Sequence, residues 1–443
     1  MGDYATITGG VLLVGATSDL PTRVAEATES LRTPDPASAD CDGNGVLDEC
    51  ELADGSAIDC DGNNAIDSCE IAADPGLDCD DDGILDSCEF ADGTAPDINQ
   101  NGVHDACESQ LVFDVPSTFA TIASAFAVAP DGSVIGLDPG VYTEPIDFAD
   151  RNLVIRGDLD DPSAVVIDGS AAPASIVTFA GGQTSDAGLQ GLTVTGGTMG
   201  TPLPGQPTSL AGGAVFVNGC SPHFDRVIFR DNVAGFGGGV YALGGDSTYV
   251  DCVFRNNFAS TDGGGFMSFD SNAEVRGCVF DDNRAVNDGG ATKIARGQAL
   301  IADCEIFDNQ ATEGGGIYFF SSPDTVPLRI EGTSVTNNLA TKFGGGIKAR
   351  FGLPGFTILD SIMCDNEPDS IVGDYEDLGG NTLCVCPCDL NGDGLVNGVD
   401  LGLYLGYQST CIPGEYCPID FDGDGVITGG DLGLLLGAWG LCP

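Results

Sequence analysis

The sequence predicts a mainly β protein whose body is a right-handed parallel β-helix, a solenoid of stacked turns, between two shorter flanking regions. Three repeats predict this organisation. An acidic unit that opens at Asp40 recurs three more times at a constant step, and an asparagine followed by glycines recurs at a longer step through the middle of the chain. Near the end, an acidic segment that opens at Asp389 is repeated from Asp420. The predicted regions are 1–39, unassigned; 40–108, four acidic repeats; 109–383, the β-helix; and 384–443, a small duplicated α-helical domain.

The composition excludes several classes of function. The chain of 443 residues has a formal net charge of −53, which excludes a nucleic-acid binder and disfavours attraction to an anionic membrane. Such an imbalance is common in disordered chains, but 42% apolar residues and 66 glycines indicate compact structure. The 18 cysteines indicate an oxidising compartment. The sequence has no apolar run of about 20 residues that would span a membrane.

The N-terminal region, 1–39, does not show the export signal that such a compartment requires. The segment MGDYATITGGVLLVGATSDL has an acidic start, a short apolar run and no basic residue before that run. We nevertheless expect a secreted or cell-surface protein, because the cysteines and the acidic loops described next both favour that location.

The acidic units have the spacing of calcium-binding loops. In DCDDDGILDSCE, residues 78–89, carboxylates stand at positions 1, 3, 5, 9 and 12, and Gly83 stands at position 6, where such a loop turns sharply. Like charges a few ångströms apart repel by about 4 kcal/mol per pair near a surface, and a divalent cation offsets that repulsion. The second loop has Asn64 at the turn, and asparagine is the next best residue for a left-handed conformation. The predicted Ca²⁺ ligands, with position 7 offering its backbone carbonyl, are Asp40, Asp42, Asn44, Val46, Asp48 and Glu51; Asp59, Asp61, Asn63, Ala65, Asp67 and Glu70; Asp78, Asp80, Asp82, Ile84, Asp86 and Glu89; and Asp97, Asn99, Asn101, Val103, Asp105 and Glu108.

A solvated acidic linker is the alternative interpretation, but a four-fold repeat with alternating ligand positions favours calcium. Seven residues separate successive loops, too few for the two helices that flank an EF-hand loop. The array therefore resembles the thrombospondin type 3 repeats, a family organised by ions rather than by a core, and cysteines at positions 2 and 11 support that resemblance. Pairing within repeats would leave only Cys107 unpaired and pairing between successive repeats would leave three, and the sequence leaves this choice open. The pairs within repeats would be Cys41–Cys50, Cys60–Cys69 and Cys79–Cys88.

From residue 111 to about 383, short apolar alternations are broken by glycine. The segments CVFRNNFASTDGGGF, CVFDDNRAVNDGGAT and CEIFDNQATEGGGIY repeat with one period, and a period of this size with short strands is typical of a solenoid. An antiparallel sandwich is the alternative, but it gives no reason for an asparagine in every period. We expect apolar residues inside each turn and the asparagines in a hydrogen-bonded ladder at a corner. The expected interior residues are Phe229, Phe254, Phe280 and Ile306, and the expected ladder is Asn232, Asn257, Asn283, Asn309, Asn338 and Asn366.

Five cysteines of this region have predicted roles. Cys252, Cys278 and Cys304 share one column of the stack, and we expect buried thiols there rather than a metal site. Cys364 and Cys384 flank the last turn, and we expect a disulfide between them.

The start of the solenoid carries a family resemblance. The segment TFATIASAFAVAPDGSVIGLDPGVYTEPIDFADRNLVIRG resembles the opening of pectin methylesterases and related pectate-lyase-like proteins. Its helix-like stretch, residues 119–128, would cap the open end of the stack. The asparagine and glycine-pair turns also resemble those of bacterial polymorphic outer-membrane proteins. Together these resemblances cover most of residues 111–383 and imply the fold rather than an activity.

The sequence offers only a weak catalytic hypothesis. The segments Gly-Tyr-Gln-Asp-Thr and Asp-Phe-Ile-Phe-Gly of pectin methylesterases do not occur, and neither does the Arg-Ile-Lys segment of polygalacturonases. His104 lies inside an acidic loop, and His223 alternates outward in its strand. Lyases of this fold can use calcium-bound aspartates with an arginine or lysine base, and stacked aspartates and arginines can equally be a solvated flank. The candidate set on adjacent turns is Arg255, Asp281, Asp282 and Asp308.

The C-terminal region is a duplication of one acidic loop followed by one helix. An Asp at position 12 and the tandem arrangement resemble a type I dockerin, which implies Ca²⁺ binding and a cohesin partner. Dockerins usually recognise cohesins through Ser-Thr pairs, and residues 398–399 and 429–430 are Gly-Val and Gly-Gly instead. Cys386 and Cys411 recur in the second half as Cys417 and Cys442, so each half is expected to hold its own disulfide. The predicted ligands are Asp389, Asn391, Asp393, Leu395, Asn397 and Asp400, and Asp420, Asp422, Asp424, Val426, Thr428 and Asp431.

Two functions follow as hypotheses. The first is calcium-dependent structural or adhesive work at a cell surface or in an extracellular assembly, with the β-helix flank as a carbohydrate- or protein-binding face. The second is a polysaccharide lyase or hydrolase anchored by the C-terminal region. The expected partners are a cohesin-like or other surface protein and an extracellular polysaccharide, with no nucleic acid.

Overall fold

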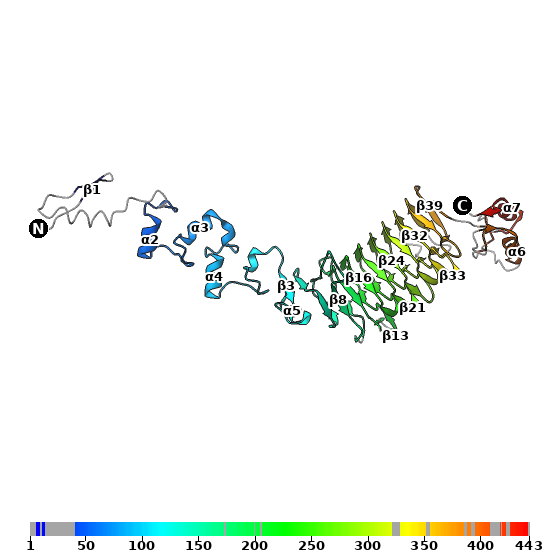
Figure 1. Ribbon diagram of the computed structural model, residues 1–443, viewed down its shortest axis with the longest axis horizontal. Coiled ribbons are helices and arrows are strands. Elements are labelled where there is room, and N and C mark those ends of the chain that lie inside the picture. The colour runs from blue at the N-terminus through cyan, green and yellow to red at the C-terminus, as the bar shows by residue number, and fades with distance from the viewer. Residues whose placement is uncertain are drawn as a thin grey trace. The chain divides into compact units, whose positions relative to one another are not determined.

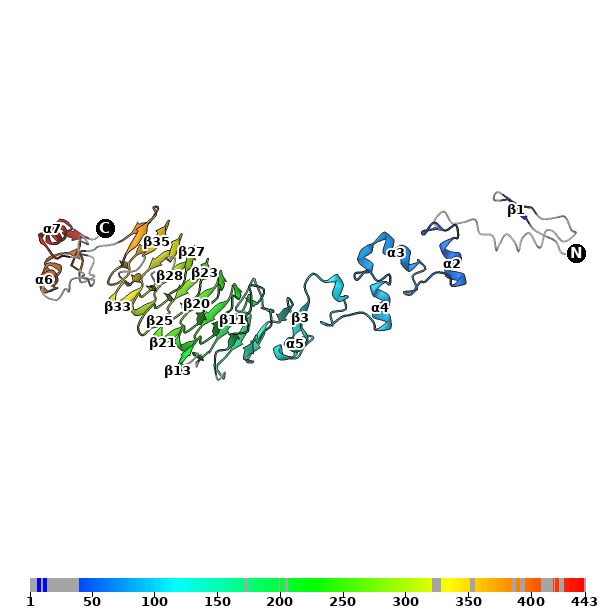
Figure 2. The ribbon, with the colours of Figure 1, turned by 180° about the vertical axis from the view of Figure 1, so that it is seen from behind.

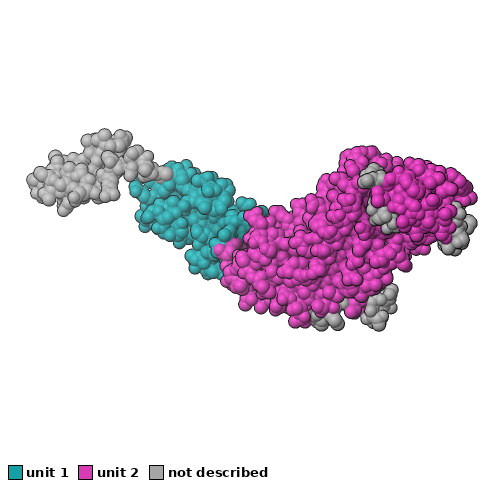
Figure 3. All heavy atoms as spheres, turned by 45° about the vertical axis from the view of Figure 1, so that its right-hand side comes forward, with its two compact units in different colours: residues 1–97, 102–109 teal, residues 98–101, 110–443 magenta. Residues whose placement is uncertain are grey.

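The computed structural model describes most of the chain in two compact units (Figures 1 and 3). The first unit comprises residues 1–97 and 102–109, and the second comprises 98–101 and 110–443. The described residues are 40–171, 174–198, 200–203, 206–320, 328–350, 355–384, 388–390, 395–407, 417, 419–421 and 426–441, together with the backbone of an antiparallel pair, β1 (Thr6–Thr8) and β2 (Val11–Leu13).

In the first unit, each acidic loop from the first to the third leads into a short α-helix. Each helix begins at loop position 9, and its first turn holds the position-12 glutamate, where acidic side chains interact favourably with the helix dipole. The residue before each helix is extended and apolar: Leu47, Ile66 or Leu85. The helices are α2 (Asp48–Asp54), α3 (Asp67–Ala73) and α4 (Asp86–Asp92), and the 3₁₀ turns are η1 (Pro75–Leu77) and η2 (Asp105–Cys107).

Disulfides link each acidic unit to the next. The bridges are Cys41–Cys69, Cys60–Cys88 and Cys79–Cys107, each 28 residues apart in sequence. Pairing within repeats is therefore wrong, and so is the expectation that Cys107 lacks a mate. A ladder that joins position 2 of one repeat to position 11 of the following repeat leaves one cysteine over rather than the three expected, because only the first repeat lacks an earlier neighbour. That cysteine is Cys50, an exposed free thiol.

The second unit contains the predicted right-handed parallel β-helix, in which strands of successive turns stack into four sheets (Figures 1 and 2). The first sheet is β3 (Val112–Val115), β4 (Val134–Leu137), β7 (Val154–Arg156), β10 (Gly188–Gln190), β15 (His223–Asp225), β19 (Thr248–Val250), β23 (Ala273–Arg276), β27 (Ala299–Ala302), β31 (Arg329–Glu331), β35 (Phe356–Leu359) and β38 (Tyr375–Asp377). The second sheet is β5 (Gly140–Tyr142), β8 (Val165–Asp168), β11 (Thr193–Thr195), β16 (Ile228–Arg230), β20 (Val253–Arg255), β24 (Val279–Asp281), β28 (Glu305–Phe307), β32 (Ser334–Thr336), β36 (Ile362–Cys364) and β39 (Thr382–Leu383).

The third and fourth sheets complete each turn. The third sheet is β6 (Ile146–Asp147), β9 (Val177–Phe179), β14 (Val215–Asn218), β18 (Val240–Leu243), β22 (Phe266–Phe269), β26 (Thr292–Ala295), β30 (Ile317–Phe320), β34 (Ile347–Ala349) and β37 (Ile371–Val372). The fourth is β12 (Thr201–Leu203), β13 (Gln206–Ala211), β17 (Val233–Phe236), β21 (Phe258–Asp262), β25 (Arg284–Ala285), β29 (Gln310–Glu313) and β33 (Leu339–Phe343). Within these sheets all described pairings are parallel except the β12–β13 hairpin.

Stacked aromatic rings fill the interior of the β-helix. Phe229, Phe254, Phe280 and Ile306 are all buried, as predicted. Ring centroids lie 4.9 Å apart from Phe229 to Phe254 and 4.5 Å apart from Phe254 to Phe280, so the rings follow the step between turns. Cys252, Cys278 and Cys304 are buried free thiols as predicted, and Cys220 is a fourth. The predicted Cys364–Cys384 disulfide is present.

The asparagine ladder is also present. The Nδ2 of each asparagine donates to the Oδ1 of the next, at 3.1 Å for Asn232 to Asn257 and 2.9 Å for Asn338 to Asn366. The residue before each one has a left-handed backbone, with φ between 52° and 57°, a conformation that asparagine and aspartate adopt more readily than other side-chain-bearing residues. That constraint explains why the column holds Asp231, Asn256, Asp282, Asp308, Asn337 and Asp365.

Both ends of the second unit have helices. At the start, α5 (Ile122–Val128) buries Ile122 and Ala125 against the core, and a capping box of Thr121 and Ser124 begins it. At the end, α6 (Gly398–Tyr407) and α7 (Gly429–Gly437) accompany the antiparallel pair β40 (Leu395–Val396) and β41 (Gly440–Leu441). A separate small core there contains Cys388, Val396, Tyr404, Cys417, Ile419 and Leu435.

The predicted C-terminal bridges involve Cys386, Cys411 and Cys442, which lie outside the described residues, whereas Cys417 is described and disulfide-bonded. Over the part of the chain that the structure describes, no helix has the length and apolar character needed to cross a membrane.

Candidate functional site

The four residues of the catalytic hypothesis lie together on the second sheet and its corner. Arg255 on β20 pairs in register with Asp281 on β24, and its Nε donates to the Asp281 carboxylate at 2.7 Å. Asp282 and Asp308 follow at the corner, both exposed and both left-handed. Burial and the charges of Asp281 and Asp308 raise the pKa of Asp282, and Arg255 opposes them. The backbone requirement of the corner accounts for Asp282 and Asp308 without catalysis.

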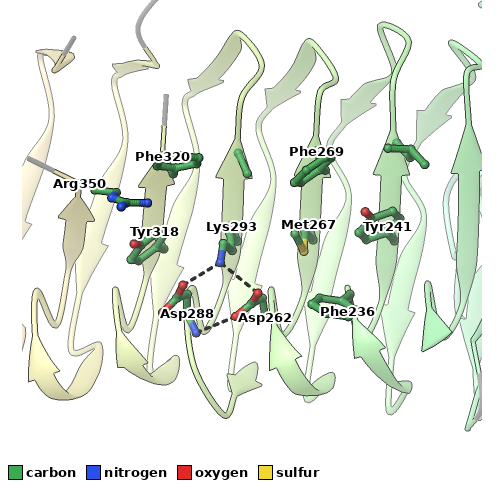
Figure 4. A pocket seen from close by; sticks show the side chains of 12 residues that line it. Phe236, Tyr241, Asp262, Met267, Phe269, Asp288, Lys293, Tyr318, Phe320 and Arg350 are labelled. Atoms are coloured by element: carbon green, nitrogen blue, oxygen red, sulfur yellow. Dashed lines mark hydrogen bonds and ion pairs between the residues drawn. The ribbon is translucent and has the colours of Figure 1, made fainter. Parts of the chain in front are cut away.

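A groove of about 510 Å³ lies elsewhere, on the outer face of the third sheet (Figure 4). Because side chains alternate along a strand, Val240 and Ala242 enter the core while Tyr241 and Leu243 point outward. Parallel pairing then aligns the outward residues of successive turns into columns. One column is Tyr241, Met267, Lys293 and Tyr318; the next is Leu243, Phe269, Ala295 and Phe320; and Phe236, Asp262, Asp288 and Arg350 complete the lining.

An ionic cluster occupies the middle of this groove. Lys293 Nζ lies 3.0 Å from Asp262 Oδ2 and 2.7 Å from Asp288 Oδ2, and 4.9 Å from the ring centroid of Tyr318 (Figure 4). The backbone N–H of Asp288 also donates to Asp262 at 3.3 Å. Burial raises the pKa of the Asp262 carboxyl, and the Lys293 ammonium opposes that rise. The Lys293 ammonium thus holds the carboxylates of both Asp262 and Asp288 in place.

The groove has an apolar part and a cationic part. At the apolar part, Tyr241 is only 3% exposed, because its ring packs against that of the buried Phe216, with centroids 6.0 Å apart. At the cationic part, the Arg350 guanidinium lies 4.9 Å from the Phe320 ring centroid. Burial raises the pKa of Tyr241 and of Tyr318 to about 12, so both phenols remain neutral hydrogen-bond donors at ordinary pH.

Sequence reasoning missed the groove, although a signal was present. The four-residue strands that follow the glycine clusters, VYAL, FMSF, TKIA and IYFF, each place an aromatic, long or charged residue at their outward second position. The interior phenylalanines and the corner aspartates were the repeated positions identified from the sequence. Reading the outward positions of the same period would have found the column.

The acidic loops of the first unit share one hydrogen-bond arrangement. The position-6 amide donates to the position-1 carboxylate in all four loops, from Gly45, Asn64, Gly83 and Gly102, at 2.9 to 3.0 Å. Those four residues have φ of 66° to 89°, so Asn64 performs the turn that glycine performs elsewhere. The position-9 carboxylates of the first three loops accept from the position-2 amides, at 3.0 to 3.1 Å.

Three of the position-12 glutamates each bury one carboxylate oxygen. Glu51, Glu70 and Glu89 each bury an Oε2 that accepts no hydrogen bond from the described residues. Asn44 and Asn63, at position 5, donate to the other oxygen of Glu51 and Glu70 at 2.7 Å. Burial and the charges of Asp80 and Asp82 raise the pKa of Glu89, and His104 opposes them.

The remaining ligand residues of these loops lie close by. Position-7 amides donate to position-5 side chains, from Val46, Ala65 and Ile84, at 2.7 to 2.9 Å. Ligand atoms of Asp78, Asp80 and Asp82 lie within 4.8 Å of one another. The predicted ligands of the fourth loop are described as well: Asp97, Asn99, Asn101, Val103, Asp105 and Glu108.

The C-terminal loops are described in part. Asp400 is buried and accepts from the amides of Leu390 and Asn397 at 2.7 and 2.8 Å. Asp431 repeats this with the amides of Phe421 and Thr428 at 2.8 and 2.7 Å, so the duplication holds at position 12. Asp389, Leu395, Asp420 and Val426 are described as well, and the predicted ligands Asn391, Asp393, Asp422 and Asp424 lie outside the described residues.

A comparison with known families agrees with the fold. The family described as right handed beta helix region matches residues 213–382. A pectin methylesterase from Aspergillus niger is similar in structure with a TM-score of 0.34 and 13% identity, over 64% of this chain and 94% of that chain. Pectin methylesterase PemA from Erwinia chrysanthemi has a TM-score of 0.32 and 15% identity, over 60% of this chain and 80% of that chain. The mannuronan C-5 epimerase AlgE6 A-module from Azotobacter vinelandii has a TM-score of 0.21 and 16% identity, over 59% of this chain and 93% of that chain. No curated protein matches the chain.

Proposed function

We propose that the β-helix binds an extended carbohydrate chain in the groove of its third sheet, and that Ca²⁺ holds the flanking acidic loops folded. The observation that carries the binding proposal is the alignment of aromatic and polar side chains in outward columns, from Tyr241 to Tyr318. Neighbouring turns are about 4.8 Å apart, a step comparable with the length of one sugar residue. A saccharide chain lying across the strands would therefore meet a new pair of side chains at each step.

The chemistry of the lining suits a sugar. Aromatic rings offer faces to the apolar faces of sugar rings, and a few fixed polar groups give orientation, which is the usual composition of a small-molecule site. Tyr241 and Tyr318 offer neutral hydroxyl donors, and Asp288 offers a carboxylate acceptor. The Lys293 ammonium holds both carboxylates in place, so the polar groups are preorganised before a ligand arrives.

Binding is tested by calorimetric titration of the full chain with cellohexaose and hexagalacturonate. Tyr318→Ala and Phe320→Ala each remove a partly exposed ring of the groove, worth about 1.4 kcal/mol, so the affinity of the responding saccharide should fall about tenfold. Tyr375→Ala is the matched control, because Tyr375 is an exposed tyrosine on the first sheet. Equal affinity in all three variants would refute the groove as the binding site.

A second candidate, turnover of the bound glycan, is favoured by one observation. Asp262 and Asp288 are paired carboxylates in the groove, and burial raises the pKa of Asp262, as expected of a general acid. Reducing-end and unsaturated-product assays on both saccharides test this candidate, with Asp262→Asn as the variant that should abolish product. Arg255→Ala on the second sheet tests the other catalytic hypothesis in the same assay.

The acidic loops of the first unit fit calcium. Calcium takes oxygen ligands from carboxylates, amides and carbonyls, which is the donor set of these loops. The buried, unpartnered Oε2 atoms of Glu51, Glu70 and Glu89 are acceptors that a cation would satisfy. No lysine or arginine occurs between Arg32 and Arg151, so the array has no cationic side chain of its own beyond a histidine. The ligands that would hold the ion in each loop are those predicted from the spacing.

The C-terminal region offers a surface for a partner. Leu405 and Tyr407 on α6 and Leu434 and Leu436 on α7 are exposed, as is Trp439 beyond α7. Exposed apolar side chains of this density on a small domain mark an interaction surface. We propose a cohesin-like or other extracellular protein there, and secretion or cell-surface display accords with the disulfides of the array.

A further inference from the structure

One histidine of the array points into a loop other than its own. His104 is at position 8 of the fourth repeat, and only 2% of its surface is exposed. Its Nε2 has no hydrogen-bond partner among the described residues and faces the third loop. That nitrogen lies 3.5 Å from Glu89 Oε2 and 4.0 Å from Asp80 Oδ2. A buried polar atom without a partner is costly, so this arrangement needs a reason.

The imidazole faces the loop as a donor. The backbone N–H of Ala106 donates to His104 Nδ1 at 3.1 Å, so Nδ1 offers its lone pair there. In a neutral imidazole the other nitrogen then carries the hydrogen. Nε2, which lies 3.5 Å from Glu89 Oε2, therefore carries the hydrogen, and this tautomer does not present a lone pair to a metal ion. The histidine is suited to orient a ligand rather than to be one.

The third loop lacks a donor that the first two loops possess. In those loops the position-5 asparagines, Asn44 and Asn63, donate to the position-12 glutamate at 2.7 Å. Position 5 of the third loop is Asp82, and a carboxylate only accepts. Position 8 is Leu47, Ile66 and Leu85 in the first three repeats and histidine in the fourth. Of Glu51, Glu70 and Glu89, only Glu89 has no asparagine at position 5 of its own loop, and His104 lies beside that glutamate.

We propose that His104 is a positioning residue of the third calcium site, which donates through Nε2 to Glu89 and so replaces the missing position-5 amide. The proposal rests on calcium binding by these loops, as proposed above. The Cys79–Cys107 disulfide holds the fourth repeat against the third loop only three residues after His104. The third site is therefore completed by the following repeat, and its affinity depends on that repeat being folded.

The test is a calorimetric calcium titration of the full chain and its variants. His104→Leu places the aliphatic residue of the other repeats at this position, and should weaken one site about tenfold while the other sites are unchanged. His104→Gln keeps a side-chain N–H and should recover most of the affinity. Asp82→Asn gives the third loop a position-5 amide that can donate to Glu89. In that background, His104→Leu should weaken the third site much less than tenfold. Identical near-ultraviolet circular dichroism at saturating calcium verifies that each variant is folded.

Three results would overturn the positioning role of His104. The first is calcium binding in which His104→Leu changes no site. The second is an equal loss from His104→Leu with and without the Asp82→Asn substitution, and the third is failure of His104→Gln to recover affinity; either would make the histidine a packing residue. Absence of calcium binding by the unaltered chain is a different outcome, which would refute the calcium proposal itself.

Discussion

The acidic array and the β-helix are stabilised in different ways although both are repeats. The β-helix has a continuous apolar core from Phe113 to Met363, with an amide ladder along one corner. In the described part of the array, the buried apolar side chains are Ile66, Leu85 and Cys88. Three disulfides and the loops replace a core there. Conformational entropy opposes folding in both regions, so a repeat that buries little apolar surface needs cross-links, and we propose that it also needs bound ions.

The largest contrast is expected on calcium removal. Chelation should unfold residues 40–109 and leave the β-helix folded, because unscreened carboxylates repel while the apolar core is unaffected. Limited proteolysis with and without chelator, with cleavage sites assigned by mass spectrometry, measures it. Cleavage should concentrate in the array only after chelation. Equal protease resistance of the array in both samples would remove the proposed role of ions.

A ladder substitution should affect the β-helix alone. Asn283 Nδ2 donates to Asn309 at 3.0 Å and to the Phe254 carbonyl at 2.7 Å, and both acceptors are buried. Asn283→Ala removes the side-chain donor of the Phe254 carbonyl and the side-chain acceptor of the Asn257 backbone N–H, while Asn309 Oδ1 keeps the backbone N–H of residue 283; we therefore expect a loss of about 2–3 kcal/mol in the unfolding free energy of the β-helix. Denaturant titration measures the loss. The exposed Asn287→Ala is the control, and an equal effect of both substitutions would contradict the ladder's role.

The stability of the β-helix should also respond to a buried lysine on β34. Burial lowers the pKa of Lys348 to about 8, and Glu313 and Asp369 oppose that shift. The unfolded chain then binds more protons than the folded one between about pH 8 and the ordinary lysine pKa near 10.4, so this group adds stability as pH rises through that window. Lys348→Met should stabilise the β-helix at pH 7 by about 1 kcal/mol after solvent screening, and by less at pH 10. A difference that is independent of pH would show that Lys348 does not titrate there.

The smallest effect is expected at the unpaired cysteine of the array. Cys50→Ser removes a thiol that no bridge uses, so array stability should change by less than about 0.5 kcal/mol. Cys60→Ser is the contrast, because it breaks the bridge to Cys88 and should cost about 2–4 kcal/mol. Proteolysis of the full chain at rising temperature measures the stability of the array. Equal losses from both serines would indicate that Cys50 is also bridged.

Periodic features of this protein were predictable because each period repeats the same local requirement. Phe254 and Phe280 occupy equivalent interior positions, and Asn257 and Asn283 occupy equivalent corner positions, so one turn predicts the next. The turn at Asn64 was predictable for the same reason, because neighbouring loops have glycine at that position. The corner aspartates were harder, because Asp282 and Asp308 look like a functional cluster until their left-handed backbone is seen.

The sequence by itself determined the stacked β-helix, its interior phenylalanines, its asparagine ladder and the loop turns, because spacing along the chain encodes which positions are equivalent. Only the tertiary structure decided which equivalent positions meet. It joined Cys60 to Cys88 rather than to Cys69, aligned Tyr241 with Lys293 and Tyr318 in one groove, and brought His104 to Glu89. Those contacts depend on the rotation and rise from one repeat to the next, a spatial relation that residue spacing does not specify.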